Sequence, residues 1–224
     1  MLFPVLIGLA ITLFAHALAR LAGQYWPKLP VVVMSLVLVM LILAVSQWPY
    51  VEYYAAVGGI FERLLGYVTV ALAIPLAAMR LNDLPLKPLS RLLLIATLMG
   101  AILPMGLAWL LHLSSTTTLA FATRAVTTPI AINIAELIHA PAALASLIVI
   151  LSGLIGAALS PLLLRNLNDE RAAGLALGLA AHAIGTVEAW QRGPVAGRYA
   201  AFGMAVNGLL TAFWLPLAFH ALKM

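Results

Sequence analysis

Long apolar runs separated by short polar stretches make up nearly the whole sequence, and this pattern limits the fold more than any other feature. A helix needs about 20 apolar residues to cross the hydrocarbon core of a bilayer. With short loops, roughly seven or eight such helices fit into 224 residues, which leaves no length for a separate soluble domain. The pattern therefore predicts an all-α polytopic membrane protein, with residues 1–224 forming a single transmembrane domain.

Charged residues are too scarce for a soluble protein. They make up 8% of the chain, against about a quarter in ordinary soluble domains, while 64% of the residues are hydrophobic. This composition excludes a soluble monomer, a disordered chain and a nucleic-acid-binding protein. The net charge of +5 comes from single Lys and Arg residues between apolar runs, where they signal membrane topology. The chain has no cysteine, which excludes disulfides, thiol catalysis and Cys-based metal sites.

The apolar pattern divides the chain into segments of helix length. Clean segments are predicted over residues 2–19, 30–46, 57–79, 92–111, 141–164, 172–189 and 199–221. Residues 114–137 are only moderately apolar. No basic region precedes the first segment, so we interpret it as an uncleaved span and not as a signal peptide. Two halves of about four segments each suit an inverted-repeat transporter, although the sequence identity between the halves is negligible.

Basic residues orient the first half of the chain. The first and third loops contain Arg20, Lys28, Arg80, Lys87 and Arg91. Because cytoplasmic loops carry an excess of Lys and Arg, these two loops are predicted to be cytoplasmic and the N-terminus to be outside. Basic residues do not determine the orientation of the second half, since the loops at residues 165–171 and 192–198 carry two of them each. Such a tie would arise if residues 114–138 do not cross the membrane as a simple helix.

The segment with the strongest signal for a binding site reads Thr123-Arg124-Ala125-Val126-Thr127-Thr128-Pro129-Ile130-Ala131. Pro129 removes a backbone donor and clashes with the preceding turn, and it pushes Thr128 out of the α region. In hydrocarbon, such a break is tolerated only where it is buried in protein or lines a wet cavity. Two threonine hydroxyls and the charge of Arg124 suit a small carboxylate. The alternative is an amphipathic loop or proline kink, with Arg124 reaching the headgroups.

A second candidate is the small-residue segment over residues 174–188. His182 lies deep in this segment, where an ionisable group needs a partner or water, so we interpret it as functional. A proton-coupled step through His182 is an open alternative to a hydrogen bond with a ligand. Gly185 and Thr186 are predicted to interrupt the helix, and Glu188 is placed to pair with His182 or with an arginine.

The remaining polar features carry weaker signals. Gly174 and Gly178 form a GxxxG spacing, which favours close helix packing and is a weaker sign of dimerisation. Asn133 and Asn207 are amides in apolar stretches, where interhelical hydrogen bonds are more common than ligand contacts. The histidines outside this segment show no metal-ligand spacing, and no catalytic motif is present. We therefore expect no enzymatic activity, no metal and no cofactor.

Three stretches resemble motifs of the LrgB/CidB family. The residues Ala125-Val126-Thr127-Thr128-Pro129-Ile130-Ala131 look like its SVTTPIA motif. Those from Gly174 to Gly178, followed by Ala181-His182-Ala183-Ile184-Gly185-Thr186, resemble its GLAMG…SHAIGT motif, and residues 70–76 resemble VALAxPLY. The order and spacing of the motifs match, and the resemblance covers nearly the whole chain.

The resemblance implies a multi-pass protein of the bacterial inner membrane. Bacterial members of the family are described as antiholin-like or as regulators of murein hydrolases and cell lysis, and they usually act with a small LrgA/CidA-like partner. A plastid relative transports glycolate and glycerate, and bacterial members have been tied to pyruvate and other small organic acids. The resemblance thus points to a carboxylate carrier, in agreement with the features of the Thr-Thr-Pro break.

The sequence departs from the family pattern at three places. After the TTPIA stretch, the chain reads Ile132-Asn133-Ile134-Ala135-Glu136 where the family has small residues and a glycine pair. After HAIGT, Glu188 stands where the family commonly has Arg, and Gln191 stands where it has an acid. Valines replace a family Asn-Pro at residues 31–33. Glu188 would repel a carboxylate, and Arg124 would supply the missing positive charge.

Two functional hypotheses result. The first is a carrier for a small monocarboxylate or 2-hydroxy acid, and the second is a holin/antiholin-type regulator that acts through an LrgA/CidA-like partner. We expect a homodimer embedded in the lipid bilayer. The candidate substrate-binding residues are Arg124, Thr127, Thr128, Pro129, Asn133, His182, Gly185, Thr186 and Glu188.

Overall fold

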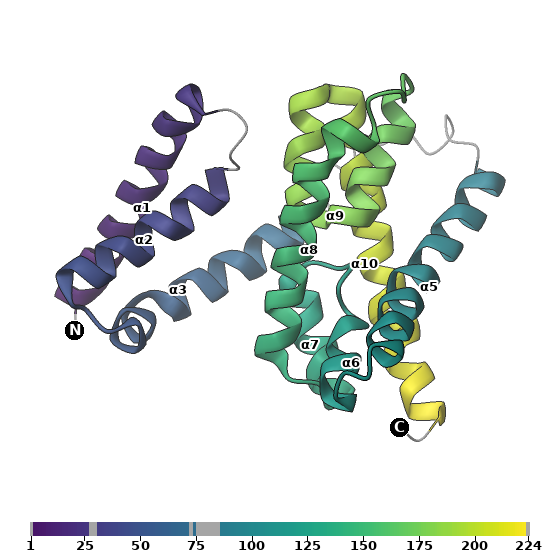
Figure 1. Cartoon of the computed structure of the whole chain (residues 1–224), viewed down its shortest axis with the longest axis horizontal. Coiled ribbons are helices and arrows are strands. Elements are labelled where there is room, and N and C mark those ends of the chain that lie inside the picture. The colour runs from purple at the N-terminus through teal and green to yellow at the C-terminus, as the bar shows by residue number, and fades with distance from the viewer. Residues whose placement is uncertain (1, 27–30, 72–73, 75–85, 223–224) are drawn as a thin grey trace. The chain divides into compact units, whose positions relative to one another are not determined.

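The computed structural model describes residues 2–26, 31–71, 74 and 86–222, and the elements found in them are helices. They are α1 (Leu2–Tyr25), α2 (Val31–Ser46), α3 (Tyr50–Ala71), α5 (Leu86–Leu110), α6 (Ser115–Phe121), α7 (Thr128–Leu137), α8 (Ala142–Leu163), α9 (Glu170–Arg192) and α10 (Pro194–Leu222) (Figure 1). In this described part, α1, α5, α8, α9 and α10 are long and apolar enough to cross a membrane. The predicted all-α multi-pass membrane fold is confirmed.

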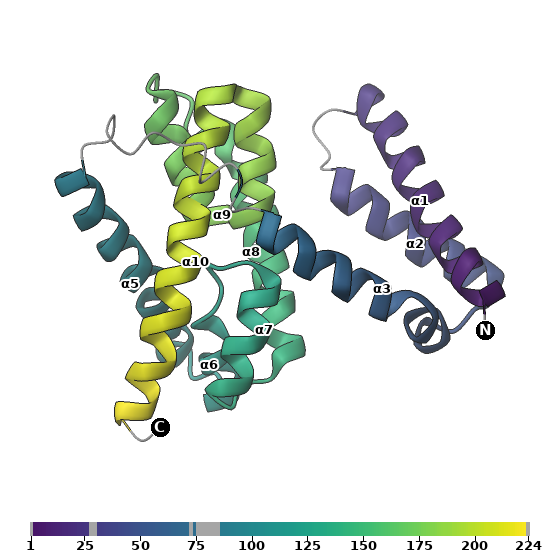
Figure 2. The same cartoon turned by 180° about the vertical axis from the view of Figure 1, so that it is seen from behind.

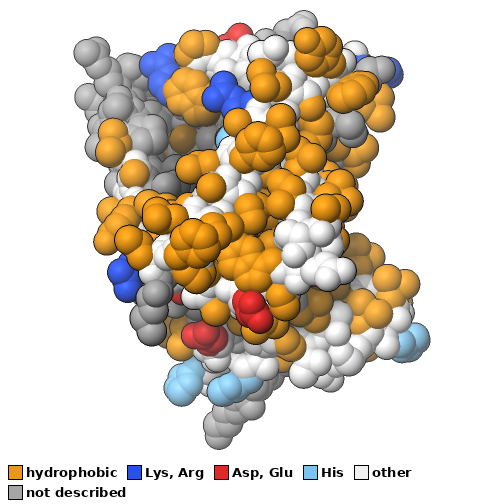
Figure 3. All heavy atoms as spheres, turned by 90° about the vertical axis from the view of Figure 1, so that its left-hand side faces the viewer, with side chains coloured by type: hydrophobic (Ala, Val, Ile, Leu, Met, Phe, Trp, Pro, Cys, Tyr) orange, Lys and Arg blue, Asp and Glu red, His pale blue; other side chains and the backbone are white. Residues whose placement is uncertain are grey.

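The surface of the molecule is apolar in the way that a bilayer requires. Figure 3 shows hydrophobic side chains over much of the face that it displays. Large apolar side chains that are 70–73% exposed include Leu2, Phe3, Trp109, Leu163 and Leu209. Since a soluble monomer rarely exposes contiguous apolar patches of this kind, the surface is suited to contact with lipid.

The chain divides into two compact units, Met1–Val68 and Thr69–Met224. In the first unit, Tyr53 and Val57 of α3 pack with Leu43 of α2 in a small core. The hydroxyl groups of Thr12 and Tyr53 lie 2.7 Å apart and join α1 to α3. The single transmembrane domain expected over residues 1–224 stays a prediction. Pro75, which follows the first unit and belongs to the third family-like stretch, lies outside the described residues.

In the second unit, α6 and α7 form a hairpin. They have seven and ten residues and are therefore only about 10 and 15 Å long, whereas the hydrocarbon core is about 30 Å thick. The chain leaves the helical path over residues 122–127 and turns back into α7, and both views show the two short helices at the same end of the unit as the start of α8 (Figures 1 and 2). We call residues 115–137 hairpin A and residues 122–127 tip A. The predicted discontinuity of residues 114–137 is confirmed.

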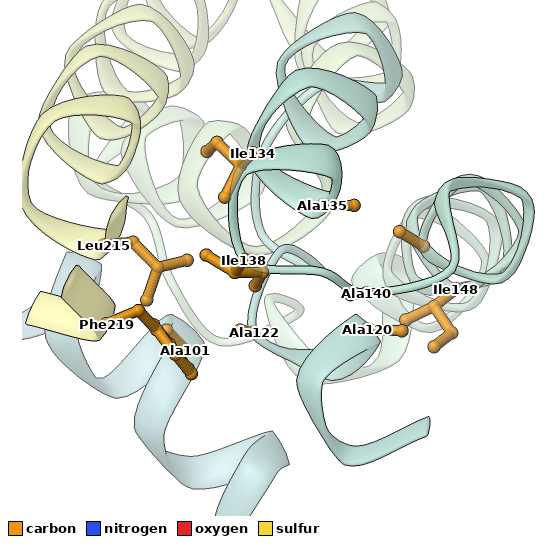
Figure 4. Close-up of a cluster of buried hydrophobic side chains, with 11 residues drawn as sticks. Ala101, Ala120, Ala122, Ile134, Ala135, Ile138, Ala140, Ile148, Leu215 and Phe219 are labelled. Carbon is orange, nitrogen blue, oxygen red and sulfur yellow. The ribbon is translucent and has the colours of Figure 1, made fainter. Parts of the chain in front are cut away.

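A hydrophobic cluster holds hairpin A against its neighbours. It joins Ile134 and Ile138 from α7 and the end that follows it to Ala101 of α5 and to Leu215 and Phe219 of α10 (Figure 4). These residues are at most 7% exposed. Small alanines from both legs of the hairpin fill the space between the larger side chains, so α5, α8 and α10 enclose the short helices.

The segment α9 is also a hairpin. His182 has φ 39° and ψ −124°, which breaks the helix in the middle. A straight helix of 23 residues would place its ends about 33 Å apart. Instead, a Cβ on Gly193 would lie 3.1 Å from Oε2 of Glu170, so the two ends of α9 meet. The apolar segment predicted over residues 172–189 is therefore not one straight helix: the interruption predicted in it is present, and the chain reverses at His182.

We call residues 170–192 hairpin B, with legs 170–181 and 183–192 and His182 as tip B. The first leg packs directly on α10. Gly174 lies against the backbone of Ala196, and Gly178 lies against the backbone of Ala200. The step of four residues runs in the same direction on both helices, so the first leg and α10 are parallel. The GxxxG spacing therefore serves close packing within this chain.

The order of hairpin and long helix occurs twice in opposite directions. Residues 115–163 form hairpin A followed by α8, and residues 170–222 form hairpin B followed by α10. Hairpin A begins and ends where α8 starts, whereas hairpin B begins and ends where α8 has finished and α10 starts. The two hairpins thus enter the unit from opposite ends, which is the arrangement that an inverted repeat produces.

Charge is distributed unevenly between the two ends of the second unit. Within residues 86–222, the Lys and Arg side chains outside tip A belong to the starts of α5 and α10 and to the ends of hairpin B: Lys87, Arg91, Arg165, Arg171, Arg192 and Arg198. The opposite end carries His112, Glu136, His139 and His220. The positive-inside rule therefore predicts that the ends of hairpin B face the cytoplasm. The tie between the two basic loops comes from hairpin B, which returns both loops to one end, and not from residues 114–138 as expected.

The hairpin assignment predicts the sidedness of two loops. In the natural cysteine-free chain, Asn166→Cys and Gln191→Cys should both resist a membrane-impermeant maleimide in intact cells and react in inverted vesicles. Both side chains are exposed: Asn166 precedes hairpin B, and Gln191 lies in its last turn. Ser115→Cys, at the start of hairpin A, should react in intact cells. If residues 166 and 191 are labelled from opposite sides, α9 crosses the membrane once and the hairpin is wrong.

The close approach of α9 and α10 predicts a stability difference between two glycine substitutions. Gly178→Ala should lower the free energy of unfolding by about 1–3 kcal/mol, because the added methyl group overlaps the backbone of Ala200. Gly106→Ala in α5 is the matched control, since a Cβ there meets nothing within 4 Å. Thermal unfolding of the detergent-purified variants measures the difference, and equal melting temperatures would contradict it.

Candidate functional site

Tip A begins where α6 ends. After Phe121, the amides of residues 122–124 and 126 make tight turn hydrogen bonds, and Thr127 then adopts an extended conformation with φ −75° and ψ 152°. Helix α7 starts at Thr128 with Pro129 as its second residue, where the missing N–H of proline costs no helical hydrogen bond. The extended residue is therefore Thr127, one position before the predicted Thr128.

Thr127 stands at the N-terminus of α7 but its side chain does not cap the helix. The residue is 7% exposed, and its Oγ1 has no hydrogen-bond partner in the described chain. A buried polar atom without a partner is rare in proteins, because desolvation without a hydrogen bond costs about 1–3 kcal/mol. The hydroxyl therefore stays available to a ligand.

Tip B is the backbone reversal at His182. His182 has a positive φ inside a helical segment, whereas the other non-glycine residues with a positive φ in the described chain closely follow helix ends. Such a conformation costs about 1–3 kcal/mol. The Oγ1 of Thr186 donates to the carbonyl of His182 at 2.8 Å, which satisfies one group freed by the break. The break predicted in this segment is present, but it lies at His182 and not at Gly185 and Thr186, which both belong to the second leg. Gly185 is needed there because a Cβ would overlap the carbonyl oxygen of Leu177 on the first leg.

The imidazole of His182 is 2% exposed, and its Nε2 has no partner in the described chain. In residues 2–26, 31–71, 74 and 86–222, three buried side-chain nitrogen or oxygen atoms lack a partner, and the third is Nε1 of Trp214. Two of the three thus belong to the two tips. This concentration of unpaired groups at the helix breaks marks the level of the tips as the candidate site.

One turn of α8 touches both tips. Arg124 of tip A donates from Nη1 to Oγ of Ser152 at 2.9 Å. On the adjacent residue, Gly153, a Cβ would lie 2.6 Å from Cε1 of His182. Val149, one turn earlier, packs with Val126 of tip A. Positions 149, 152 and 153 lie on one face of the helix, so α8 brings Arg124 and His182 to the same level.

Helix α10 also reaches both tips. Asn207 donates from Nδ2 to the carbonyl oxygen of Ala125 at 2.6 Å and accepts a hydrogen bond from the hydroxyl of Thr97 at 2.7 Å. One turn earlier on α10, the sulfur of Met204 lies 3.7 Å from Oγ1 of Thr186. Asn207 is 1% exposed, so it joins α5, α10 and tip A inside the protein.

The electrostatics of this level favour an anion. The helices over residues 128–137 and 183–192 both begin at the tips, and the unpaired N–H groups of their first turns carry partial positive charge. Arg124 adds a full positive charge, and no carboxylate of the described chain lies within 4.0 Å of it, where the ion pair found is Asp169 with Arg171. Two helix N-termini, one guanidinium and two buried donors suit a small anion with a single charge.

The candidate residues from the sequence are only partly brought together. Arg124, Thr127, Thr128 and Pro129 lie in or next to tip A, and His182, Gly185 and Thr186 lie in or next to tip B. Asn133 is exposed on α7, and its Nδ2 donates to the carbonyl of Pro129 on the same helix. Glu188 is half-buried six residues after His182, about 9 Å further along the second leg. The structure shows neither a hydrogen bond nor an ion pair for Glu188.

Several residues at this level were missed by sequence reasoning. Ser152 and Thr97 are single hydroxyl residues in apolar spans, and nothing in a single sequence distinguishes them from other such residues. Asn207 was predicted to be an interhelical bridge, and the structure confirms that role. In the described part of the chain, no group of three or more His, Cys, Asp or Glu side chains is arranged to hold a metal ion.

Two opposed helical hairpins, whose tips both reach the same turn of α8, define a multi-pass membrane protein with buried polar groups in its interior. The LrgB-like family model matches residues 4–221. YwbG of Bacillus subtilis (strain 168) is 32% identical over 96% of this chain and 97% of its own length. The antiholin-like protein LrgB of Bacillus cereus (strain B4264) is 28% identical over 94% of both chains.

The holin-like protein CidB of Staphylococcus epidermidis (strain RP62A) is 25% identical over 82% of this chain and 80% of its own. No solved structure matches the chain. The family match covers both tips and the helices of the described residues, apart from the first two residues of α1 and the last residue of α10. The chain belongs to the LrgB-like family, as its motifs predicted.

The buried amide network predicts a large difference between two asparagines. Asn207→Leu should lower the free energy of unfolding by about 2–3 kcal/mol, since it leaves Thr97 and the carbonyl of Ala125 unpaired in the interior. Asn133→Leu should have little effect, because that side chain is exposed and bonds only to its own helix. Thermal melts of the two variants in the same detergent test this. A destabilisation by Asn133→Leu as large as that by Asn207→Leu would contradict it.

Proposed function

We propose that this protein is a carrier for small organic anions, monocarboxylates or 2-hydroxy acids, in the bacterial inner membrane. The observation that carries the proposal is the meeting of tips A and B at one level, with Arg124 and the unpartnered Thr127 and His182. A regulator that acts only through its surface needs no such internal polar groups. Buried polar groups in a membrane protein are costly and mark substrate pathways.

In this carrier, the carboxylate lies at tip A. The guanidinium of Arg124 binds it through parallel N–H donors, and the first amides of α7 and the hydroxyl of Thr127 complete its hydrogen bonds. Thr128 and Pro129 shape the start of α7. Nε2 of His182, at tip B, hydrogen-bonds the second oxygen of a 2-hydroxy acid or 2-oxo acid. Gly185 and Thr186 keep the second leg of hairpin B close to this point.

The opposed hairpins support alternating access. Hairpin A lies between the tips and one end of the unit, and hairpin B lies between the tips and the other end. Opening the protein on one side of a hairpin therefore exposes the site to one aqueous phase only, while the other hairpin keeps it closed. To open the site, either the second unit moves as a rigid body or one hairpin shifts. We expect no cofactor to take part in either movement.

Transport assays with purified protein in proteoliposomes test the proposal. Labelled pyruvate, glycolate, lactate and acetate are the substrates, and we expect saturable uptake of at least one. Arg124→Gln should weaken substrate affinity by about 10–100-fold, because a charge-assisted hydrogen bond contributes roughly 1.5–3 kcal/mol. Arg165→Gln is the matched control, since Arg165 lies in the exposed loop before α9. A folded protein that transports none of these anions would refute the carrier.

The names of the relatives support a second candidate function. Holin-like and antiholin-like relatives suggest a regulator of lysis that acts with a small LrgA/CidA-like membrane partner, as a homodimer or in a mixed assembly. The two functions separate in cells that carry Thr127→Val or His182→Gln. A carrier-based function loses lysis control together with transport, whereas a scaffold keeps lysis control when both substitutions are present and the protein is still assembled.

A further inference from the structure

The serines of α8 differ in what their hydroxyl groups do. Ser146 donates to the carbonyl of Ala142 at 2.8 Å, and Ser160 donates to the carbonyl of Ala157 at 2.9 Å. Such bonds to the preceding turn are the usual way for serine to satisfy itself in a helix. Ser152 instead accepts a hydrogen bond from Nη1 of Arg124 on tip A. The hydroxyl of Ser152 therefore serves another segment of the chain.

Ser152 provides the side-chain contact that orients Arg124. The amide of Arg124 donates to the carbonyl of Phe121 at 3.2 Å, which restrains the backbone but leaves the long side chain free. A guanidinium has five N–H donors, and the structure shows one of them bonded, to Ser152. No carboxylate of the described chain lies within 4.0 Å of the guanidinium to orient it in another direction.

Gly153, the residue after Ser152, contacts tip B. Gly153 has no side chain, and the imidazole of His182 occupies the space that a Cβ would fill, with Cε1 2.6 Å from that position. Ser152 and Gly153 thus hold one polar group from each tip on adjacent positions of one helix. When Ser152 binds the guanidinium of Arg124, the remaining N–H donors of that group stay at the same depth as the imidazole of His182.

We propose that Ser152 is a positioning residue, which sets the orientation of Arg124 for the anion that the site binds. The inference rests on the proposed carrier function. Ser152 does not touch the substrate and acts through Arg124. Without the hydroxyl of Ser152, the guanidinium of Arg124 samples several rotamers. Binding the anion must then order this side chain, which weakens the affinity.

Transport kinetics test the positioning role. Ser152→Ala should raise KM about tenfold with kcat changed less than about twofold, which is the loss of one hydrogen bond to a charged group. Ser152→Thr keeps a hydroxyl and should restore most of the affinity. Ser146→Ala, on the same helix, should leave KM unchanged. An equal effect of the alanine substitutions at 146 and 152, or no rescue by threonine, would overturn the proposal.

A double-substitution cycle shows whether Ser152 acts through Arg124. In the Arg124→Gln background, Ser152→Ala should add less than about a twofold change in KM, since the group that it orients is absent. Additive effects of the two substitutions would overturn the proposal.

A chemical readout separates this inference from the carrier function. Phenylglyoxal modifies guanidinium groups, and peptide mass spectrometry measures the rate at Arg124. The rate should rise at least about threefold in Ser152→Ala and not in Ser146→Ala, because the guanidinium loses its hydrogen-bond acceptor. Equal rates in all three proteins would overturn the inference. If the wild type transports nothing but the rate at Arg124 still rises in Ser152→Ala, the carrier function fails and the positioning contact stands.

Discussion

Unsatisfied backbone groups in a bilayer set the main constraint on this protein. Hydrocarbon offers no water to the N–H and C=O groups of a broken helix, so each break must be surrounded by other parts of the chain. Helices α8 and α10, together with the second leg of hairpin B, do this for the two breaks. Asn207 binds the carbonyl of Ala125 in tip A, Thr186 binds the carbonyl of His182 in tip B, and α8 packs against both. The long helices thus surround the two breaks, and the candidate site lies at the depth where α8 and α10 contact both tips.

The sequence predicted a break in each of the two segments, but the physical signal is much clearer for the first than for the second. At tip A, Pro129 cannot continue a helix from residues before it, and the threonines before it have hydroxyls in an apolar stretch, so the signal is local and physical. At tip B there is no proline, and His182 takes a backbone conformation that its side chain does not favour. Nothing in the residue types between 174 and 188 encodes that reversal. Only the packing of the first leg on α10 and of the imidazole on Gly153 fixes it.

The same limit explains why hairpin B resembles a single membrane span in the sequence. Residues 170–192 have the length and composition of a membrane-crossing helix, and hydropathy does not record direction. The charge pattern does indicate a reversal of direction. Basic loops both before and after residues 170–192 are inconsistent with a single crossing between them. The glycines at 174, 178 and 185 were likewise informative only in part. Their spacing indicated close packing, but the partner, α10 or the other leg, depends on the fold of the whole unit.

An inverted repeat gives two similar hairpins, but the chemistry of their tips is different. Tip A carries a permanent charge at Arg124 and a hydroxyl at Thr127, whereas tip B carries an imidazole at His182. In the proposed carrier this asymmetry orients the substrate, since only tip A offers a full positive charge to a carboxylate. The family arginine expected on hairpin B is replaced by Glu188, and a half-buried acid there adds no attraction for an anion. The binding charge then depends on Arg124 alone, which makes the contacts that hold this side chain in place decisive for which anions the protein selects.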